Sequence, residues 1–401
     1  MKHQTHGNRF RNRKRLARFI TLLKRIRTSR FPITYRRNRV VLYPDGAQFF
    51  HTLFAAIRTA QSCLFLEYYL IRNDRTGTSF AAELVAAVQR GVRVMLIYDY
   101  IGCMDTPSSY FKSLAQSGVK LVPFNVPSFR RGIGWFDRRD HRKMTIIDGS
   151  LAFLGGCNIG DEYAGLAEMP HRFRDVGFSI AGAVVQELVQ NFGETWQMER
   201  GTLPDLQSAI VARGDRRQGQ ARVAIVSGGP HHRASYIRSA FLWNIATASE
   251  EILVATPYFV PGPRITRYLL RAVRRGVRVC LLLPSRSDVP LVRLLGRSFY
   301  SALMIKGVEI YELESEILHS KVMLIDGERT VIGSANLDQR SFHRNFEINA
   351  VIDSRTFGKQ IHRMLEKQFA DSRRILLEDH ERRGVGAKLV ERVVNLFSWF
   401  L

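Results

Sequence analysis

Cysteine is scarce in this chain of 401 residues, and its placement excludes two common kinds of structure. Cys63, Cys103, Cys157 and Cys280 are scattered, with no CxxC pair and no Cys/His spacing typical of zinc ligands. We therefore expect buried, reduced thiols, and neither a disulfide scaffold nor a metal site. Reduced thiols favour a reducing, cytoplasmic compartment.

Long hydrophobic runs are also absent. No 18 consecutive residues are apolar, so a hydrophobic membrane-spanning helix is not expected. Near the N-terminus, Arg interrupts the apolar residues every few positions, which is unlike a signal peptide. Hydrophobic residues make up 45% and charged residues 24%, as in an ordinary globular protein, and the length allows two domains or one large one.

Acidic residues are missing from the first 40 positions, which hold 14 Lys and Arg residues. The first carboxylate belongs to Asp45. Over the whole chain 60 basic residues oppose 36 acidic ones, which gives a net charge of +24. This concentration of basic residues near the N-terminus favours an anionic partner, either phospholipid headgroups or nucleic acid.

An internal repeat sets the expected fold. The sequence RGVRV at 90–94 recurs at 275–279, each time after a helix-like stretch and before an apolar run. Each copy then follows the order strand, helix, strand, helix, strand and β-hairpin, with Asp-Gly turns at 148–149 and 326–327. We predict an α/β protein of two similar lobes, each a mixed β-sheet flanked by helices, related by a pseudo-twofold axis.

The predicted domain boundaries follow from the repeat and from composition. A basic amphipathic segment at 1–37 precedes a first lobe at 38–200. A polar, Gly-rich connector at 201–220 leads to the second lobe at 221–376, and an amphipathic tail occupies 377–401.

One motif occurs in both copies with identical spacing. The Lys follows the His by 2 residues, the Asp by 7, the first Gly by 14 and the Asn by 17. The residues are His141, Lys143, Asp148 and Asn158 in the first copy, and His319, Lys321, Asp326 and Asn336 in the second. A single HxK would carry no information, whereas the full pattern repeated twice does not arise by chance.

The residue types suit chemistry on a phosphate. Positions i and i+2 of a strand face the same side, so His and Lys project together, and the hairpin brings the Asn back alongside them. An imidazole can attack, an ammonium balances the anion and an amide orients an oxygen. Asp148 and Asp326 belong to the motif, but Asp-Gly is also preferred at hairpin turns, which favours a structural role for both.

The duplicated HxK(x)4D pattern resembles that of the phospholipase D superfamily. More narrowly, the stretches at 155–165, 171–182, 256–262 and 318–347 resemble those of bacterial cardiolipin synthases. The resemblance extends over residues 38–376.

The resemblance implies one active site at the interface of the lobes, with one histidine from each. His141 is expected to attack the phosphodiester and become a phosphohistidine, while His319 serves as acid and base; the symmetry leaves the reverse assignment open. No metal or other cofactor is expected, because Lys143 and Lys321 supply the positive charge.

Further site residues follow from the same resemblance. Glu347 is expected to orient the histidine of the second half and Asp175 that of the first, unless each forms only a surface salt bridge with a nearby arginine. Asn158, Ser334 and Asn336 are expected to bind phosphate. The first copy has glycine where the second has Ser334, so the two sets of donors differ.

Two terminal segments predict contact with a membrane. Residues 10–27 place five apolar residues on one helical face amid Arg and Lys, which is typical of a helix lying on anionic lipid. The tail at 389–401 is mostly apolar. Nucleic-acid binding or packing against the protein remains open for the first segment, and burial for the second. Together they predict a peripheral protein on the cytoplasmic face of the cell membrane.

The favoured function is cardiolipin synthesis, in which one phosphatidylglycerol donates its phosphatidyl group to another and glycerol is released. Phosphatidylethanolamine as a lipid partner stays open, as do the acyl preference and the oligomeric state. The alternatives are a phospholipase D that transfers the group to water, a nuclease acting on DNA, and a non-catalytic membrane-binding protein. Nucleic acid is the less favoured partner, and the two intact motifs argue against a non-catalytic role.

Overall fold

The computed structural model describes residues 33–127, 137–165, 172–200, 206, 219–229 and 236–384. These residues make up the two lobes. The predicted helix at 10–27, nearly all of the connector and the apolar tail at 389–401 lie outside the described residues.

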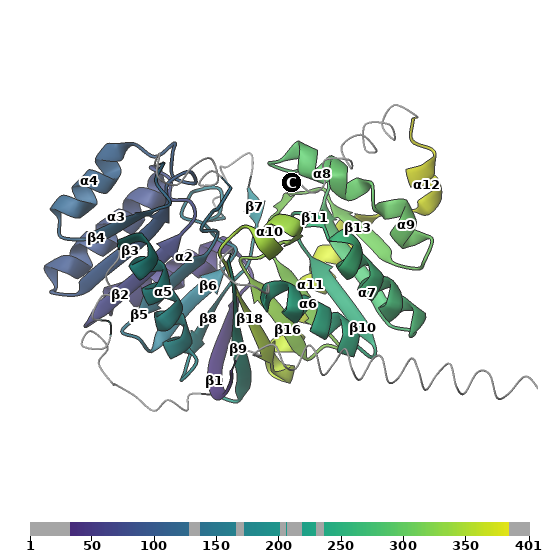
Figure 1. Ribbon diagram of the computed structural model, residues 1–401, viewed down its shortest axis with the longest axis horizontal. Coiled ribbons are helices and arrows are strands. Elements are labelled where there is room, and N and C mark those ends of the chain that lie inside the picture. The colour runs from purple at the N-terminus through teal and green to yellow at the C-terminus, as the bar shows by residue number, and fades with distance from the viewer. Residues whose placement is uncertain are drawn as a thin grey trace, which may run out of the picture. The chain divides into compact units, whose positions relative to one another are not determined.

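A 15-stranded sheet runs through the described part of the chain (Figure 1). Its strands are, in spatial order, β19 (Ser372–Arg374), β13 (Glu309–Leu313), β12 (Arg278–Pro284), β10 (Glu251–Ala255), β15 (Val322–Ile325), β16 (Arg329–Gly333), β18 (Glu347–Asp353), β9 (Ala221–Gly228), β1 (Thr34–Tyr43), β8 (Gly177–Ala181), β6 (Leu151–Gly155), β5 (Lys143–Ile147), β2 (Cys63–Tyr68), β3 (Arg93–Asp99) and β4 (Lys120–Phe124).

The two halves of this sheet repeat one another. Strands β2, β3 and β4 are parallel, as are β10, β12 and β13, and antiparallel hairpins follow in both halves. The antiparallel pair of β1 and β9, in which Thr34 faces Ala224, joins the halves at the middle of the molecule (Figure 1). The prediction of a mixed α/β fold with two similar lobes is therefore confirmed.

Helices bury apolar faces against both halves. They are α2 (Gly46–Arg58), α3 (Arg75–Gln89), α4 (Ser108–Gln116), α5 (Val185–Arg200), α6 (Tyr236–Thr247), α7 (Gly262–Arg274), α8 (Pro290–Arg297), α9 (Tyr300–Met304), α10 (Gln339–His343), α11 (Arg355–Ala370) and α12 (Leu377–Glu381). One core cluster lies under α2, α3 and α4, and a second lies under α6, α7 and α9. A third cluster, with residues of α5 and α11, continues through both lobes.

Local sequence explains the ends of several elements. Asp45 and Asp74 cap α2 and α3, where each carboxylate accepts a hydrogen bond from a backbone N–H in the first turn. Both central residues of each Asp-Gly turn have positive φ, at 49° and 59° in the first lobe and 51° and 63° in the second. Positive φ at both central residues is typical of hairpin turns. Three residues separate the paired strands in each hairpin, between Ile147 and Leu151 and between Ile325 and Arg329, which agrees with the predicted hairpins.

Short pairings between the lobes complete the frame of the site. Strand β7 (Phe173–Arg174) of the first lobe pairs in parallel with β14 (Ile317–Leu318) of the second, and β7 lies between the two halves in Figure 1. A matching bridge joins Asp140 to Phe346. A further pair, β11 (Phe259–Val260) with β17 (Leu337–Asp338), lies within the second lobe. None of the described helices is long and apolar enough to cross a membrane.

Candidate active site

Each motif histidine is fixed by the backbone of the opposite lobe. His141 precedes β5, and its N–H donates to the carbonyl of Phe346 at 2.9 Å. His319 lies between β14 and β15, and its N–H donates to the carbonyl of Arg174 at 2.9 Å. The pairing strands of one lobe therefore set the position of the other lobe's histidine.

The orienting carboxylates cross between the lobes. Nδ1 of His141 lies 3.1 Å from Glu347 Oε1, and Nδ1 of His319 lies 2.5 Å from Asp175 Oδ2. The expectation that Glu347 serves the second half and Asp175 the first was wrong, because the interlobe pairings carry each carboxylate strand to the opposite histidine. An ionised carboxylate only accepts, so Nδ1 of His141 carries the proton and its Nε2 keeps a free lone pair. At His319 the Asp175 contact favours the same tautomer, and Lys321 Nζ also lies 2.8 Å from Nδ1.

The two lysines are buried beside the histidines. Lys143 Nζ donates to the carbonyl of His141 at 2.6 Å and lies 5.0 Å from the centre of the Tyr69 ring. Lys321 Nζ donates to the carbonyl of His319 and lies 3.9 Å from Asp175 Oδ2. Their exposed fractions are only 2% and 3%, so the side chains of both lysines are enclosed by the protein.

Burial and the charges of the lysines shift the pKa values of the histidines, and burial shifts that of Lys143. Burial and the charge of Lys143 lower the pKa of His141 to about 4, although Glu347 opposes the shift. Burial and the charge of Lys321 likewise lower the pKa of His319. Burial also lowers the pKa of Lys143, to about 7, against the opposing charge of Glu347. The imidazoles are therefore neutral at pH 7, the state in which Nε2 can attack.

The carboxylates stay ionised for the opposite reason. Burial alone would raise the pKa of Glu347, but the charges of His141 and Lys143 and the hydrogen bonds with His141 and Ser334 lower it overall. The pKa of Asp175 is lowered in the same way by Lys321 and His319. Since Lys321 also lowers the pKa of His141, the two halves lie within electrostatic reach of one another.

The predicted phosphate ligands divide into two groups. Asn158 and Asn336 are buried, and the Oδ1 atom of each has no hydrogen-bond partner among the described residues. Oδ1 is an acceptor, so a phosphate contact would come from Nδ2, and Asn158 Nδ2 already donates one of its two protons to the Tyr163 hydroxyl at 2.8 Å. Ser334 differs, because its hydroxyl donates to Glu347 Oε2 at 2.5 Å. Its single proton is engaged, so the structure gives it a positioning contact in place of the expected phosphate contact. The matching Gly156 leaves room for Asp175, which a Cβ would approach to 2.2 Å.

The motif aspartates lie away from the histidines. Asp148 Oδ1 accepts hydrogen bonds from the backbone of Ser62 and Cys63 at 2.7 and 3.0 Å, at the start of β2. Asp326 does the same for Glu250 and Glu251 at 2.8 and 3.0 Å, at the start of β10. The structure thus brings together the histidines, lysines and crossed carboxylates, and it places these two aspartates at the other end of the hairpin strands.

Sequence reasoning missed the aromatic walls and the charges behind His141. The ring of Tyr69 lies 5.0 Å from His141, and those of Tyr163 and Phe173 lie 5.3 and 5.0 Å from His319. Behind His141, the guanidinium of Arg142 pairs with Glu67 at 3.2 Å. Tyr69 directly follows the end of β2, and this position was the sequence signal that could have identified it as a site residue.

All four cysteines are free and buried, as expected. Burial raises the pKa of each thiol above its ordinary value. Within the described residues, no group of three or more His, Cys, Asp or Glu side chains is arranged to hold a metal ion.

Comparison with known families agrees with this geometry. The family described as "Cardiolipin synthase, PLD-like domain" matches residues 53–196 and, a second time, residues 241–370. The chain belongs to this family. Each match contains one motif histidine with its lysine, in line with the duplicated fold.

Curated relatives support the same placement over most of the chain. The cardiolipin synthase of Geobacillus kaustophilus is 35% identical over 382 residues, which cover 93% of this chain and 74% of the relative. Cardiolipin synthase A of Pseudomonas entomophila is 35% identical over 366 residues, covering 90% and 74%. Cardiolipin synthase 2 of Bacillus anthracis is 33% identical over 357 residues, covering 88% and 69%.

Solved structures support the fold. Phosphatidylserine synthase of Haemophilus influenzae Rd KW20 superposes with a TM-score of 0.70 at 12% identity, covering 94% of this chain and 97% of that one. Polyphosphate kinase of Porphyromonas gingivalis gives 0.57 at 15% identity, covering 91% and 53%. At these identities the likeness concerns the fold alone.

Proposed function

We propose that this member of the family is a phosphatidyltransferase that makes cardiolipin from two molecules of phosphatidylglycerol and releases glycerol. The observation that carries the proposal is the pair of crossed His–carboxylate contacts, which supports one site formed by both lobes with one imidazole from each. Two imidazoles next to the side chains of Lys143 and Lys321 suit a reaction with two successive displacements at a phosphodiester.

The first displacement uses one imidazole from each lobe. His141 Nε2 attacks the phosphorus while its Nδ1 proton stays hydrogen-bonded to Glu347. His319 takes up a proton from solvent at Nε2 when the phosphodiester binds; the bond from phosphorus to the glycerol oxygen then breaks, and His319 gives that oxygen this proton. The products are a phosphatidyl group on His141 and free glycerol. The negative phosphodiester opposes the charge of Lys321 and so raises the affinity of His319 for the proton that it must donate.

The second displacement reverses these roles. His319, now neutral, removes the proton from a hydroxyl of the second phosphatidylglycerol. The resulting oxygen attacks the phosphorus, the bond to His141 breaks, and cardiolipin leaves. Throughout, Lys143 and Lys321 balance the charge on the phosphoryl oxygens, and the Nδ2 groups of Asn158 and Asn336 donate hydrogen bonds to them.

Product analysis tests the proposal directly. Purified full-length protein is incubated with phosphatidylglycerol vesicles, and cardiolipin, phosphatidic acid and glycerol are quantified. Equal amounts of cardiolipin and glycerol are expected. Phosphatidic acid without cardiolipin would identify a hydrolase, and cleavage of single-stranded or plasmid DNA without lipid turnover would identify a nuclease.

Chelation tests the proposed charge balance. Because the two lysines supply the positive charge, turnover is expected to be unchanged in EDTA. Loss of activity that a divalent ion restores would show that the lysines do not suffice.

The membrane location is part of the proposal. Deletion of residues 1–31 removes 11 basic residues and the apolar stripe but no motif residue. We expect weaker, less salt-sensitive binding to anionic vesicles, a higher KM on vesicles and an unchanged kcat on detergent-dispersed substrate. Identical co-sedimentation of the two proteins at every salt concentration would refute an anchoring role.

A location on the cytoplasmic face is checked by protease accessibility in inverted and right-side-out vesicles.

A further inference from the structure

Five consecutive described helices of the second lobe are rich in arginine, and two of these arginines, Arg297 and Arg340, pair with Glu312 and Asp137 of other segments at 3.5 Å each. Together α6, α7, α8, α9 and α10 contain eight arginines and no Asp or Glu. Half of these arginines belong to α7, where they are spaced three, four and three residues apart: Arg264, Arg267, Arg271 and Arg274. This spacing places them along one face of the helix.

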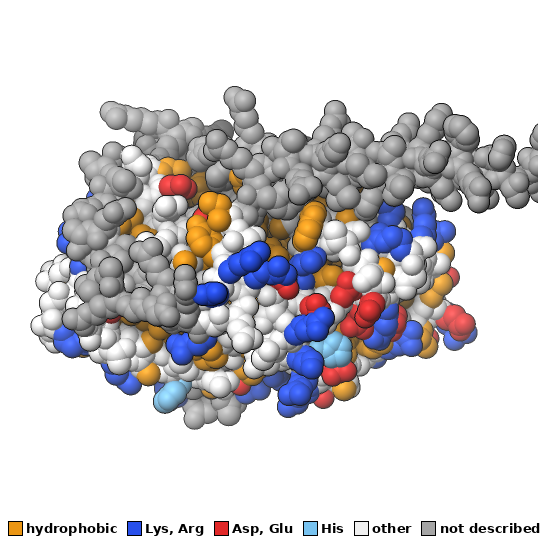
Figure 2. Space-filling view, turned by 90° about the horizontal axis from the view of Figure 1, so that it is seen from below, with side chains coloured by type: hydrophobic (Ala, Val, Ile, Leu, Met, Phe, Trp, Pro, Cys, Tyr) orange, Lys and Arg blue, Asp and Glu red, His pale blue; other side chains and the backbone are white. Residues whose placement is uncertain are grey.

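The α7 arginines form no ion pair within the described residues. Elsewhere in this lobe arginines are neutralised: Arg278 lies 2.9 Å from both Glu251 and Glu309. Basic and acidic side chains are also intermixed at one end of the face seen from below (Figure 2). Like charges three and four residues apart destabilise a helix, so the row is a cost unless an anion offsets it. Burial and the charge of Arg264 lower the pKa of Arg238 on α6, which reports the local positive potential.

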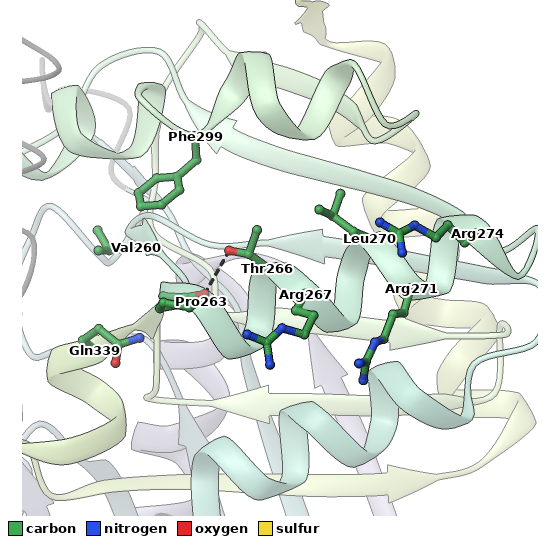
Figure 3. Close-up of a pocket in the computed structure, with 10 residues that line it drawn as sticks. Val260, Pro263, Thr266, Arg267, Leu270, Arg271, Arg274, Phe299 and Gln339 are labelled. Carbon is green, nitrogen blue, oxygen red and sulfur yellow. Dashed lines mark hydrogen bonds between the residues drawn. The ribbon is translucent and has the colours of Figure 1, made fainter. Parts of the chain in front are cut away.

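A groove of about 680 Å³ follows the same helix. Arg267, Arg271 and Arg274 line it together with the apolar side chains of Val260 and Leu270 and, from the turn between α8 and α9, Phe299. In Figure 3, Phe299 lies across from Thr266, and the arginines project from α7 along its length. The groove thus offers apolar surface and guanidinium groups side by side, as an amphipathic anion requires.

One end of the groove adjoins the catalytic half-site. Gly262 and Gln339 line this end, and the Gln339 amide donates to the carbonyl of Pro261 at 3.1 Å. Val260 pairs with Asp338 in the β11–β17 sheet, two residues beyond Asn336. A molecule in the groove would therefore lie next to the phosphate site of the second lobe.

We propose that the α7 groove binds one anionic phospholipid of the bilayer surface, with its phosphate on Arg267 and Arg271 and its apolar part against Leu270 and Phe299. The site is separate from the histidines and docks the second lobe on the membrane beside the reaction centre. The proposal depends on the proposed function only in taking phospholipid as the ligand.

Vesicle co-sedimentation of the full-length protein tests the groove. The variant carries Arg267→Gln and Arg271→Gln. The matched control carries Lys359→Gln and Arg363→Gln, which removes the same charge from positions four residues apart on α11 of the same lobe. On phosphatidylcholine vesicles containing phosphatidylglycerol, the groove variant should bind about tenfold more weakly than wild type and the control within about twofold of it. Both should keep the wild-type Tm and the wild-type kcat on detergent-dispersed substrate.

The outcomes separate the alternatives. Equal loss in both variants would show a general charge effect and overturn the groove. Loss of single-stranded DNA binding without loss of vesicle binding would assign the row to nucleic acid. If wild type makes no cardiolipin but only the groove variant loses vesicle binding, the groove stands and the proposed function fails.

A second readout reports the apolar half of the groove. Phe299→Trp places an indole there, and phosphatidylglycerol with brominated acyl chains should quench its added fluorescence. Adding Arg267→Gln and Arg271→Gln should abolish this quenching. Quenching that persists in the triple variant, or that never appears in the single one, would contradict a lipid in the groove.

Discussion

The two lobes share their motif and differ in what surrounds it. At three matching positions near the histidines, the first lobe has charged residues where the second has small or apolar ones: Glu67 against Ala255, Asp140 against Leu318, and Arg142 against Ser320. The first lobe thus has an internal ion pair close to His141, and Arg142 also donates to Thr195 at 2.8 Å. The motif histidines and lysines are therefore the same in both lobes, whereas the charged residues around each histidine differ.

The outer helices diverged as well. In the first lobe, α2, α3 and α4 carry three basic residues and one acid, and Arg58 pairs with Glu83. In the second, α6 to α10 carry eight arginines and no acid. In our proposals the lobes contribute equally to catalysis, and the second lobe has an added role at the lipid surface.

The largest effect should be the same for both lobes. His141→Ala and His319→Ala should each lower kcat by about 10⁴-fold or more, because each step needs both imidazoles. His51→Ala, on the exposed face of α2, is the control and should leave kcat unchanged. Turnover near the wild-type rate in either motif variant, with an unchanged Tm, would rule out a shared site.

Substitution of the crossed carboxylates should distinguish the catalytic contributions of the two lobes. Glu347→Gln and Asp175→Asn should each lower kcat by about 10²-fold to 10³-fold, since the imidazole loses the partner that fixes its tautomer. Because Glu347 contacts His141, its loss should slow formation of the covalent intermediate in rapid-quench experiments. Glu328→Gln, a surface carboxylate paired with Arg355, is the control. If Glu347→Gln leaves the burst rate intact, the crossed pairing has no catalytic role.

The pH dependence of kcat/KM should reflect the titration of His141 and Lys143 in the first lobe and of His319 in the second. Below pH about 4 His141 gains a proton and loses its attacking lone pair, so kcat/KM should fall on the acid side there. On the alkaline side kcat/KM should fall for two reasons: the free enzyme loses the charge of Lys143 above pH about 7, and His319, whose pKa is also lowered, loses the proton that it must donate. The bound phosphate anion favours the ammonium, so the alkaline limb of kcat should lie at higher pH. Lys143→Arg should remove the contribution of Lys143 near pH 7 and leave the contribution of His319 to the alkaline limb; a limb unchanged near pH 7 would show that Lys143 does not contribute to it.

The turn aspartates should give the smallest effect on activity and the same one in both lobes. Asp148→Ala and Asp326→Ala each leave backbone N–H groups without an acceptor, which should cost about 1–3 kcal/mol of unfolding free energy. Denaturant unfolding measures this loss, and kcat should stay within about twofold of wild type. A tenfold drop in kcat at unchanged stability would return these residues to the catalytic machinery.

Much of this architecture could be predicted from repeated local signals. The alternation of strands and helices gave both lobes, and the Asp-Gly pairs gave both hairpins, because these features depend on neighbouring residues. Identical spacing gave the histidines and lysines. None of these signals required knowledge of how the lobes meet.

The errors arose where the lobes meet. From the resemblance, Glu347 and Asp175 were each expected to serve the histidine of their own lobe, but pairing of β7 with β14 and of Asp140 with Phe346 exchanges them. Ser334 was expected to bind phosphate, yet its proton is donated to Glu347. The groove beside α7 depends on Phe299 and Val260 approaching from separate segments, which no local pattern encodes.

The number of covalent groups per chain tests the shared site most directly. Full-length protein is mixed with phosphatidylglycerol, quenched without acid, digested and analysed by mass spectrometry for phosphatidyl-histidine. The account predicts at most one phosphatidyl group per chain, carried by His141, with His319 unmodified. Simultaneous modification of His141 and His319 in the same chain would mean that each lobe works alone, and would contradict it.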